Sequence, residues 1–178
     1  MVSRKKMLIV DGYNVLRSGS RYVHMRSADD YTHDRYNQVR EALISDVAAF
    51  AGSEYRAVIV FDAADNEESA GKTENIGGIR VMFSPFGSSA DKVIEKLAHD
   101  ARMRNIETLV VTSDATIQDT VFGGGVDRMS ANGFSREMDD LHEDDVRDAA
   151  FVTEHKSTIA QRVSPAVLQK LIRMRDGR

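Results

Sequence analysis

Aspartates stand at four points of this chain where a predicted strand ends or a predicted helix begins. Asp11 follows the apolar run MLIV, Asp62 follows VIVF, and Asp114 follows LVVTS. Asp91 lies near the start of a helical pattern. Carboxylate oxygens gathered at one place suit a hard cation such as Mg²⁺ or Mn²⁺, and such ions activate water and neutralise charge on a phosphodiester. If the fold brings the four together, they predict metal-dependent phosphodiester hydrolysis.

Hydrophobic periodicity predicts the elements that would position these acids. The strands are short apolar runs, and the helices carry apolar residues at spacings of three and four, most clearly over 89–104. Residues 17–33 and 63–77 lack both patterns and are expected to be loops. The predicted strands are 6–11, 56–62, 78–83 and 108–112, and the predicted helices are 34–51, 89–104, 116–122, 132–152 and a last one beginning at Ser164.

Continuous apolar strands that alternate with helices indicate an α/β fold with a mainly parallel sheet covered on both faces. In such sheets ligands bind outside the carboxyl ends of the strands, which is where the four aspartates would lie. Two carboxylates about 5 Å apart at an effective dielectric of about 20 repel by about 3 kcal/mol. A cluster of four therefore predicts either protonated carboxyls or bound divalent cations.

Each acid also has a structural interpretation. Asp91 lies three residues after Ser88, the spacing of a helix-capping pair, and Asp114 could be a helix N-cap. Asp11 and Asp62 have no capping role in the predicted elements. Glu95, one helical turn after Asp91, is expected to be peripheral. The coincidence of four acids at one edge favours a site.

Composition sets limits on the partners. Apolar residues make up 42% of the chain and charged residues 29%, as in an ordinary soluble domain, and no apolar run is long enough for a membrane span. With no cysteine in the chain, a reducing cytoplasm is the expected location. The net charge of −4 is uneven, because residues 137–148 hold seven acids and one base, and the remainder is slightly basic. Net charge therefore does not exclude RNA.

Other sequence signals do not support a different chemistry. The run Gly71-Lys72-Thr73 imitates the end of a P-loop, but Asn66 occupies the place of its first glycine, so no nucleotide cofactor is expected. A small-ester phosphatase of the haloacid-dehalogenase type would need a second aspartate two residues after Asp11, where Tyr13 stands. The phosphatase stays as a disfavoured alternative.

The segments LIVDGYNVL, VIVFDA, SSADKVIEKLA and VVTSDATIQDTVFGGG, taken in order, resemble the YacP-like branch of the NYN domains. These domains belong to the PIN-like, FLAP-nuclease-like superfamily of metal-dependent ribonucleases. The resemblance runs from about Met7 to Leu141. It implies a three-layer α/β/α sandwich. The expected domains are a nuclease domain over residues 1–152 and a C-terminal helical extension over residues 153–178, which the resemblance does not cover.

The resemblance also implies an acidic site, dependent on Mg²⁺ or Mn²⁺, that cuts RNA internally. Asp11, Asp62, Asp91 and Asp114 would be the catalytic, metal-binding carboxylates; Asn14 would orient a ligand or phosphate, and Ser113 and Gln118 would line the site. A member of this branch is associated with the ribosome, so RNA and the ribosome are the implied partners. The alternative is an RNA- or ribosome-binding adaptor with weak catalysis. The bases that could steer RNA are Arg17, Arg21, Arg26, Lys72, Lys92 and Arg128.

Overall fold

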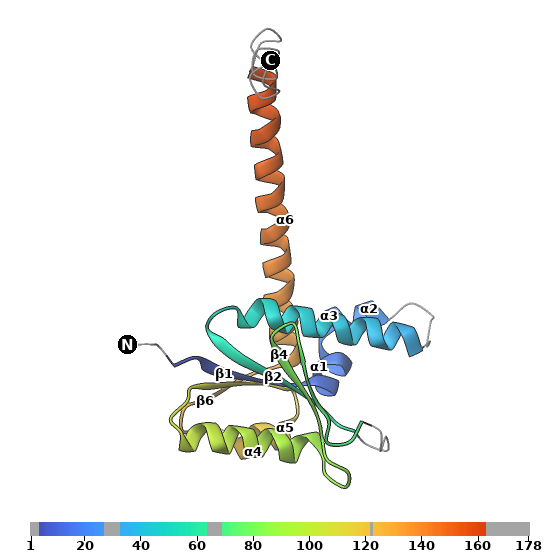
Figure 1. Ribbon diagram of the computed structural model, residues 1–178, viewed down its shortest axis with the longest axis vertical. Helices are drawn as coiled ribbons and strands as arrows, with labels where there is room; N and C mark the ends of the chain where they lie inside the picture. Colours follow the sequence, from blue (N-terminus) through green and yellow to red (C-terminus); the bar gives the residue numbers. More distant parts are fainter. Residues whose placement is uncertain (1–3, 27–32, 64–68, 122, 163–178) are drawn as a thin grey trace, which may run out of the picture. The chain divides into compact units, whose positions relative to one another are not determined.

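The computed structural model describes residues 4–26, 33–63, 69–121 and 123–162 (Figure 1). By its internal contacts the chain forms two compact units, Met1–Met138 and Asp139–Arg178. In chain order the elements are β1 Lys6–Asp11, α1 Gly12–Ser18, α2 Ser20–Arg26, α3 His33–Ala51, β2 Tyr55–Phe61, β3 Thr73–Ile76, β4 Ile79–Phe83, α4 Ala90–Met103, β5 Thr108–Val111, α5 Ala115–Val121, β6 Val126–Met129 and α6 Ala131–Arg162.

The first unit is built on a six-stranded sheet in the order β3-β4-β2-β1-β5-β6. All neighbouring strands pair in parallel except β3, which is antiparallel to β4. In the register, Val10 of β1 lies beside Ile59 of β2 and Val111 of β5. The central strands therefore end at one edge of the sheet, with the residues that follow them close together.

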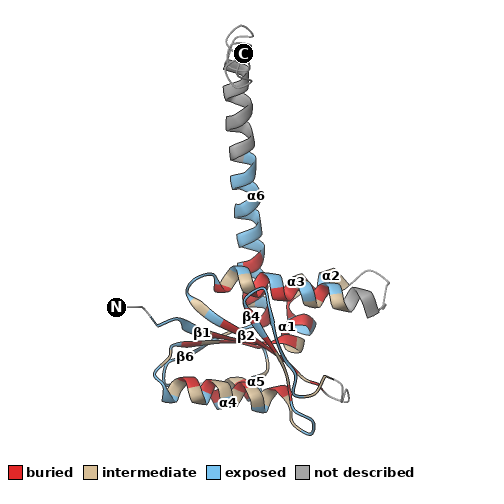
Figure 2. Cartoon of the chain, viewed as in Figure 1, coloured by how far each residue is buried: buried red, intermediate tan, exposed pale blue. Residues whose placement is uncertain are grey.

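Two apolar cores cover the two faces of this sheet. On one face, Leu8, Val10 and Phe61 pack with residues of α1, α2, α3 and the first turns of α6. On the other face, Ile9, Val58 and Val110 pack with α4 and α5. Figure 2 shows the buried residues concentrated in the central strands and in the helices that pack on them. The predicted α/β sandwich with a mainly parallel sheet is confirmed.

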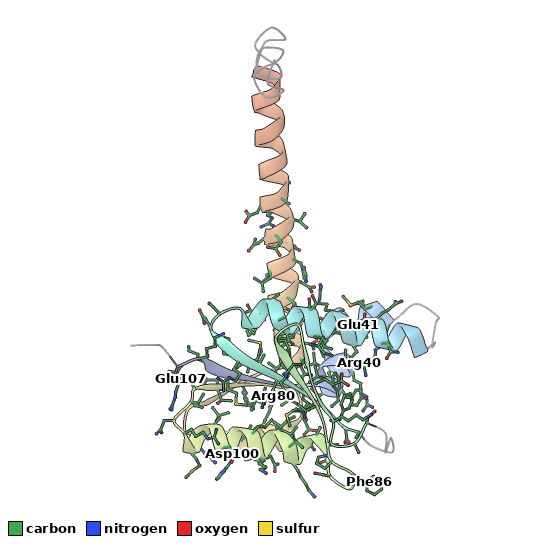
Figure 3. All side chains as sticks on the ribbon, in the orientation of Figure 1. Arg40, Glu41, Arg80, Phe86, Asp100 and Glu107 are labelled. Atoms are coloured by element: carbon green, nitrogen blue, oxygen red, sulfur yellow. The ribbon has the colours of Figure 1, made fainter. Side chains whose placement is uncertain are left out.

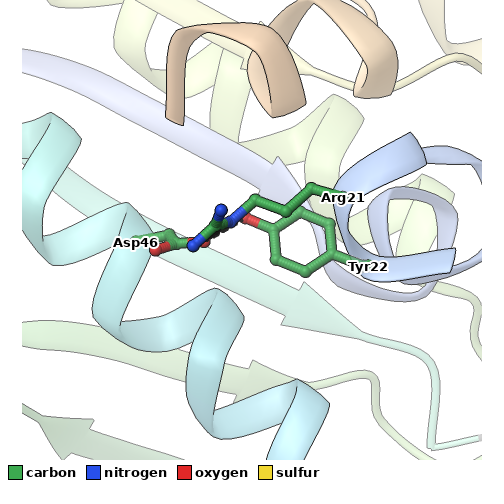
Figure 4. A network of polar contacts seen from close by, with 3 residues as sticks. All are labelled: Arg21, Tyr22 and Asp46. Atoms are coloured by element: carbon green, nitrogen blue, oxygen red, sulfur yellow. Dashed lines mark hydrogen bonds and ion pairs between the residues drawn. The ribbon is translucent and has the colours of Figure 1, made fainter. Parts of the chain in front are cut away.

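The prediction of a loop over residues 17–33 is wrong for the part that the structure describes. Helices α1 and α2 cover Gly12–Ser18 and Ser20–Arg26. The short helix α2 is held by tertiary contacts: Asp46 of α3 accepts hydrogen bonds from Arg21 Nε at 2.9 Å and Tyr22 Oη at 2.8 Å (Figure 4). Asp46 and Tyr22 are buried. Such long-range contacts leave no periodic pattern in the sequence.

The sequence prediction also missed two strands. Strand β3 lies within the predicted loop 63–77, and all its residues are exposed, so it has no apolar alternation. Strand β6 follows Gly125 and buries Val126 alone. Both are edge strands of four residues, which backbone pairing with a neighbour stabilises more than burial of their own side chains.

The second unit contains the later part of α6. Residues 139–150 are exposed, including the acids between Asp139 and Asp148. Helix α6 continues unbroken to Arg162, so a separate extension beginning at residue 153 stays a prediction. The predicted helix at Ser164 lies outside the described residues. Among those residues, no helix is long and apolar enough to cross a membrane.

Candidate active site

The four aspartates lie around one cavity at the carboxyl edge of the sheet. Asp11 is the last residue of β1, Asp62 follows β2, Asp114 precedes α5, and Asp91 lies in the first turn of α4. The cavity has a volume of about 380 Å³. Its lining residues are Asp11, Tyr13, Asn14, Arg17, Ser18, Asp62, Ala90, Asp91 and Asp114. Four chain segments that are far apart in the sequence thus present carboxylates to one space.

Asp11 is the most buried acid of the group, with 7% of its surface exposed. Its Oδ1 accepts a hydrogen bond from the Asn14 backbone N–H at 3.3 Å, and its Oδ2 accepts one from Thr112 Oγ1 at 3.0 Å. Burial raises the pKa of Asp11 to about 6; the charges of Asp91 and Asp114 add to the rise, and the two hydrogen bonds oppose it. Asp11 is also the N-cap of α1, so the expectation that it has no capping role is wrong.

Asp91 is partly buried, and its pKa is raised by that burial first and then by Asp114, Asp62 and Glu95. Neighbouring carboxylates therefore raise the pKa of both Asp11 and Asp91, after the larger effect of burial. The expected pairing of Asp91 with Ser88 is not found. Ser89 is the N-cap of α4, and its hydroxyl accepts from the Lys92 backbone N–H at 3.4 Å.

Hydroxyl groups from neighbouring strand ends contact the other two strand-end aspartates, at the carboxylate of Asp62 and at the backbone of Asp114. Ser84, just after β4, donates from Oγ to Asp62 Oδ1 at 3.0 Å. Thr112, just after β5, accepts from the Asp114 backbone N–H at 3.1 Å while donating to Asp11. Asp114 Oδ1 accepts from the Thr116 backbone N–H at 2.8 Å, which is the capping contact expected for it. The four aspartates form an acidic rim, in which hydrogen bonds link Asp11 to Asp114 through Thr112 and orient Asp62 through Ser84.

The remaining predicted site residues differ in their positions. Asn14 lines the cavity, and its Oδ1 accepts from the Ser113 backbone N–H at 2.7 Å, which ties α1 to the loop after β5. Ser113 and Gln118 are not among the lining residues. Ser113 Oγ accepts from the Ala131 backbone N–H at 2.9 Å, and Gln118 bridges the Thr112 carbonyl and Arg128. Ser113 and Gln118 therefore bind the backbone of neighbouring segments and do not line the cavity.

Sequence reasoning missed Tyr13, Ser18 and Ala90 in the lining, and the buried hydroxyls of Thr112 and Ser84. The sequence does contain a signal for these two hydroxyls, because Ser84 directly follows one predicted strand and Thr112 is the last residue of another. Arg17, one of the predicted steering bases, does line the cavity, and its Cζ lies 5.6 Å from the centre of the Tyr13 ring. Glu95 lies apart from the cavity and accepts from Thr120 Oγ1 at 2.9 Å, as its peripheral role predicted.

The side chains that line the cavity fit a hard divalent cation. They offer carboxylate, amide and hydroxyl oxygens as ligands, and no cysteine, methionine or histidine is among them. In the described part of the chain, no group of three or more His, Asp or Glu side chains is placed so that it could hold one ion. Mg²⁺ is commonly bound by one or two carboxylates together with water and substrate phosphates. Asp62, Asp91 and Asp114 are half-buried, and their carboxylates are therefore more open to such binding than that of the buried Asp11.

Known proteins place this arrangement in a family. The family model described as the YacP-like NYN domain matches residues 8–176. The match extends beyond Leu141, where the sequence resemblance was expected to end, and includes most of the C-terminal segment. The chain is 29% identical over 174 residues to the "Uncharacterized protein YacP" of Bacillus subtilis (strain 168), covering 96% of this chain and 97% of that protein.

Comparison with solved structures gives the same family. The crystal structure of Rae1 (YacP) from Bacillus subtilis has a TM-score of 0.64 and 28% identity, and the likeness covers 97% of this chain and 95% of that one. A crystal structure of a mutant of the same Bacillus subtilis protein gives a TM-score of 0.64 at 27% identity, covering 83% of each chain. The strand order, the aspartates at the strand ends and these likenesses over nearly the whole length lead to one assignment: the chain belongs to the YacP-like NYN domain family, whose NYN domains are ribonuclease domains.

Proposed function

We propose that this protein is a metal-dependent endoribonuclease that cuts RNA phosphodiester bonds, with messenger RNA on the ribosome as the substrate that the family resemblance indicates. The observation that carries the proposal is the convergence of Asp11, Asp62, Asp91 and Asp114 on one cavity. A raised pKa at Asp11 supports it, because the cluster holds its charges at a cost that a bound cation would offset.

The residues of the acidic rim would have different roles in the reaction. Asp62, Asp91 and Asp114 would present partly exposed carboxylates to a cation. Ser84 orients Asp62, and Thr112 orients the buried Asp11. When bound, Mg²⁺ or Mn²⁺ supplies Lewis-acid activation of water and neutralises charge on the phosphodiester. Arg17 stands in the same lining and would contact a phosphate of the RNA. The expected products carry a 5′-phosphate and a 3′-hydroxyl.

An exposed aromatic side chain near this edge supports RNA as the substrate. Phe86 lies between β4 and α4, in the connection that leads to Asp91, and 70% of its surface is exposed. Exposed aromatic rings are stacking platforms for unpaired bases. Figure 3 shows Phe86 at the tip of a loop that extends from the body of the sheet.

A second candidate is a catalytically weak adaptor that binds RNA or the ribosome. The lack, among the described residues, of three acids placed to hold one ion is the observation that favours it. Weak catalysis would follow if substrate binding did not bring the carboxylates together.

Cleavage of an end-labelled single-stranded RNA with Mn²⁺ tests the proposal, with Asp11→Asn and Asp91→Asn beside the wild type. Asp127→Asn is the matched control, because Asp127 is exposed on the edge strand β6 and does not line the acidic cavity. Internal cuts by the wild type and the control alone support the nuclease. A parallel assay uses messenger RNA held on ribosomes. Binding without cutting in both assays, unchanged in the variants, would establish the adaptor instead.

A further inference from the structure

A second, larger cavity lies at the amino edge of the sheet, at the other end of the strands from the acidic rim. Its volume is about 670 Å³, within the usual range for ligand sites. The lining comes from the starts of β1, β2 and β4 and from the last turns of α4 and the segment after it. The lining residues are Arg4, Lys5, Lys6, Met7, Arg56, Arg80, Leu97, Asp100, Ala101, Arg104 and Ile106.

Strand register explains how the bases come together. Arg56 shares its sheet face with Val58 of β2, and Val58 lies beside Arg80 of β4 in the parallel pairing. Because side chains alternate between faces, Arg56 and Arg80 point to the side of the sheet that α4 covers. Figure 3 labels Arg80 on the sheet and Asp100 on the facing helix. The cavity lies between these two elements.

The charge of this lining is strongly positive. Six of its residues are basic, and Asp100 is its one acid. Lys6 is paired with Glu107 at 3.1 Å, but Arg56, Arg80 and Arg104 form no side-chain ion pair with any described residue. Arginines held near one another without ion-pair partners are stabilised by an anionic ligand, and planar guanidinium groups suit phosphate oxygens.

The acidic rim makes a separate anchor necessary for a polyanionic substrate. Four aspartates and a single base, Arg17, line the rim cavity, so the rim repels phosphate unless cations are bound. Most of the affinity of proteins for nucleic acid backbones comes from contacts between basic side chains and phosphates. Those contacts must then be made by another surface, and the basic cavity lies one strand length away, about 17 Å along β1.

We propose that the basic cavity at the amino edge binds the phosphodiester backbone of RNA and anchors the RNA outside the cleavage site. The proposal rests on the ribonuclease function proposed above, since it concerns the same substrate. Arg56, Arg80 and Arg104 contact phosphates, and the partly exposed side chains of Met7 and Leu97 form an apolar floor between them.

Binding of a labelled single-stranded RNA, followed by fluorescence anisotropy in EDTA, tests the anchor. An Asp11→Asn background prevents cleavage. Arg56→Gln/Arg80→Gln is compared with Lys96→Gln/Arg136→Gln, which removes the same charge from exposed residues outside the cavity. We expect the first pair to weaken binding about tenfold and to reduce the slope of log K against log salt by about 1.4, while the control pair changes neither appreciably.

Equal affinities and slopes for the two double variants overturn the proposal. So does competition by inorganic phosphate as effective as that by RNA, which would identify a small-anion site. The acidic residues 139–148 of a second copy of the chain are an alternative occupant of the cavity, and sedimentation tests for such a dimer. If only Arg56→Gln/Arg80→Gln dissociates a dimer, and its RNA affinity is unchanged, the proposal of an RNA anchor is also overturned. Equal unfolding temperatures exclude misfolding.

Failure of the anchor is distinguishable from failure of the ribonuclease function. If the anchor is wrong and the nuclease is right, wild-type protein cleaves RNA and both double variants bind it equally. If the nuclease is wrong and the anchor is right, wild-type protein cleaves nothing, yet the loss of affinity in Arg56→Gln/Arg80→Gln remains.

Discussion

Thr112 joins two of the four rim aspartates, the carboxylate of Asp11 and the backbone of Asp114, through one buried hydroxyl. Its Oγ1 donates to Asp11 Oδ2 at 3.0 Å and accepts from the Asp114 backbone N–H at 3.1 Å. The end of β1 and the start of α5 are thereby fixed to each other, although Asp11 and Thr112 are separated by 101 positions in the sequence. The geometry of the rim depends on this side chain as much as on the acids.

Thr112→Val removes that junction and keeps the shape of the side chain. We expect a loss of about 1–3 kcal/mol in the free energy of unfolding, because a partly buried backbone N–H loses its acceptor. Loss of the donated hydrogen bond raises the pKa of Asp11 further, since that bond lowers it. Urea denaturation and the pH dependence of cleavage measure the two effects. Thr120→Val, which alters an exposed hydroxyl, is the control; an equal loss there would contradict the assignment.

Asp11→Asn is expected to stabilise the metal-free protein while abolishing cleavage. The folded-state pKa of about 6 lies above the ordinary value of 3.8, so the folded protein holds this proton more tightly than the unfolded chain. Wild-type stability should then fall as pH rises from about 4 to 6 and stay low above that range. The total fall amounts to about 3 kcal/mol, and the variant, which has no titrating group at position 11, should lack it. Denaturation at several pH values measures it; parallel curves for the two proteins would contradict it.

Divalent cations should offset the loss of stability that the charged Asp11 causes above pH 6. Mn²⁺ or Mg²⁺ that binds the folded rim adds about 2.7 kcal/mol of stability at a hundredfold excess over the dissociation constant. Thermal unfolding should therefore shift upward for wild-type protein and for Asp127→Asn, and EDTA should remove the shift. For Asp91→Asn, we expect a smaller shift. An identical shift in all three proteins would place the bound ion elsewhere.

Gly12→Ala should destabilise the fold. A Cβ at this position would lie 2.3 Å from Cε1 of Phe61, and that ring is fully buried against Tyr13 and Phe83. Overpacking of this kind costs about 1–3 kcal/mol. Combining it with Phe61→Leu should cost less than the sum of the two single changes, which a double-mutant cycle measures. Additive costs would show that Phe61 is not the obstacle.

Phe86→Ala should weaken RNA binding without changing stability. Stacking of a base on an aromatic ring contributes about 1–3 kcal/mol, so we expect at least a fivefold loss of affinity. Met103→Ala is the matched control, because Met103 is equally exposed, at 70%, but lies at the far end of α4. Anisotropy titrations of both variants measure the effect, and equal affinities would show that Phe86 makes no contact with the bases.

Local patterns predicted the central elements well. The buried strands β1, β2 and β5 are continuous apolar runs, and α4 has regular apolar spacing, so each could be recognised within a short window of sequence. The position of Asp11 at the end of an apolar run was visible in the same way. Helix α2 and strands β3 and β6 were missed, because they are short and partners elsewhere in the chain stabilise them.

The sequence by itself determined that acids follow buried parallel strands, since strand ends and sheet edges follow from hydrophobic runs and chain order. Tertiary structure alone decided which hydroxyls hold those acids and which bases meet at the opposite edge. Thr112 reaches Asp11, and Arg56 lines the same cavity as Arg80, only through strand order and register. Those depend on how the whole chain buries its apolar surface, and no short window of sequence contains that information.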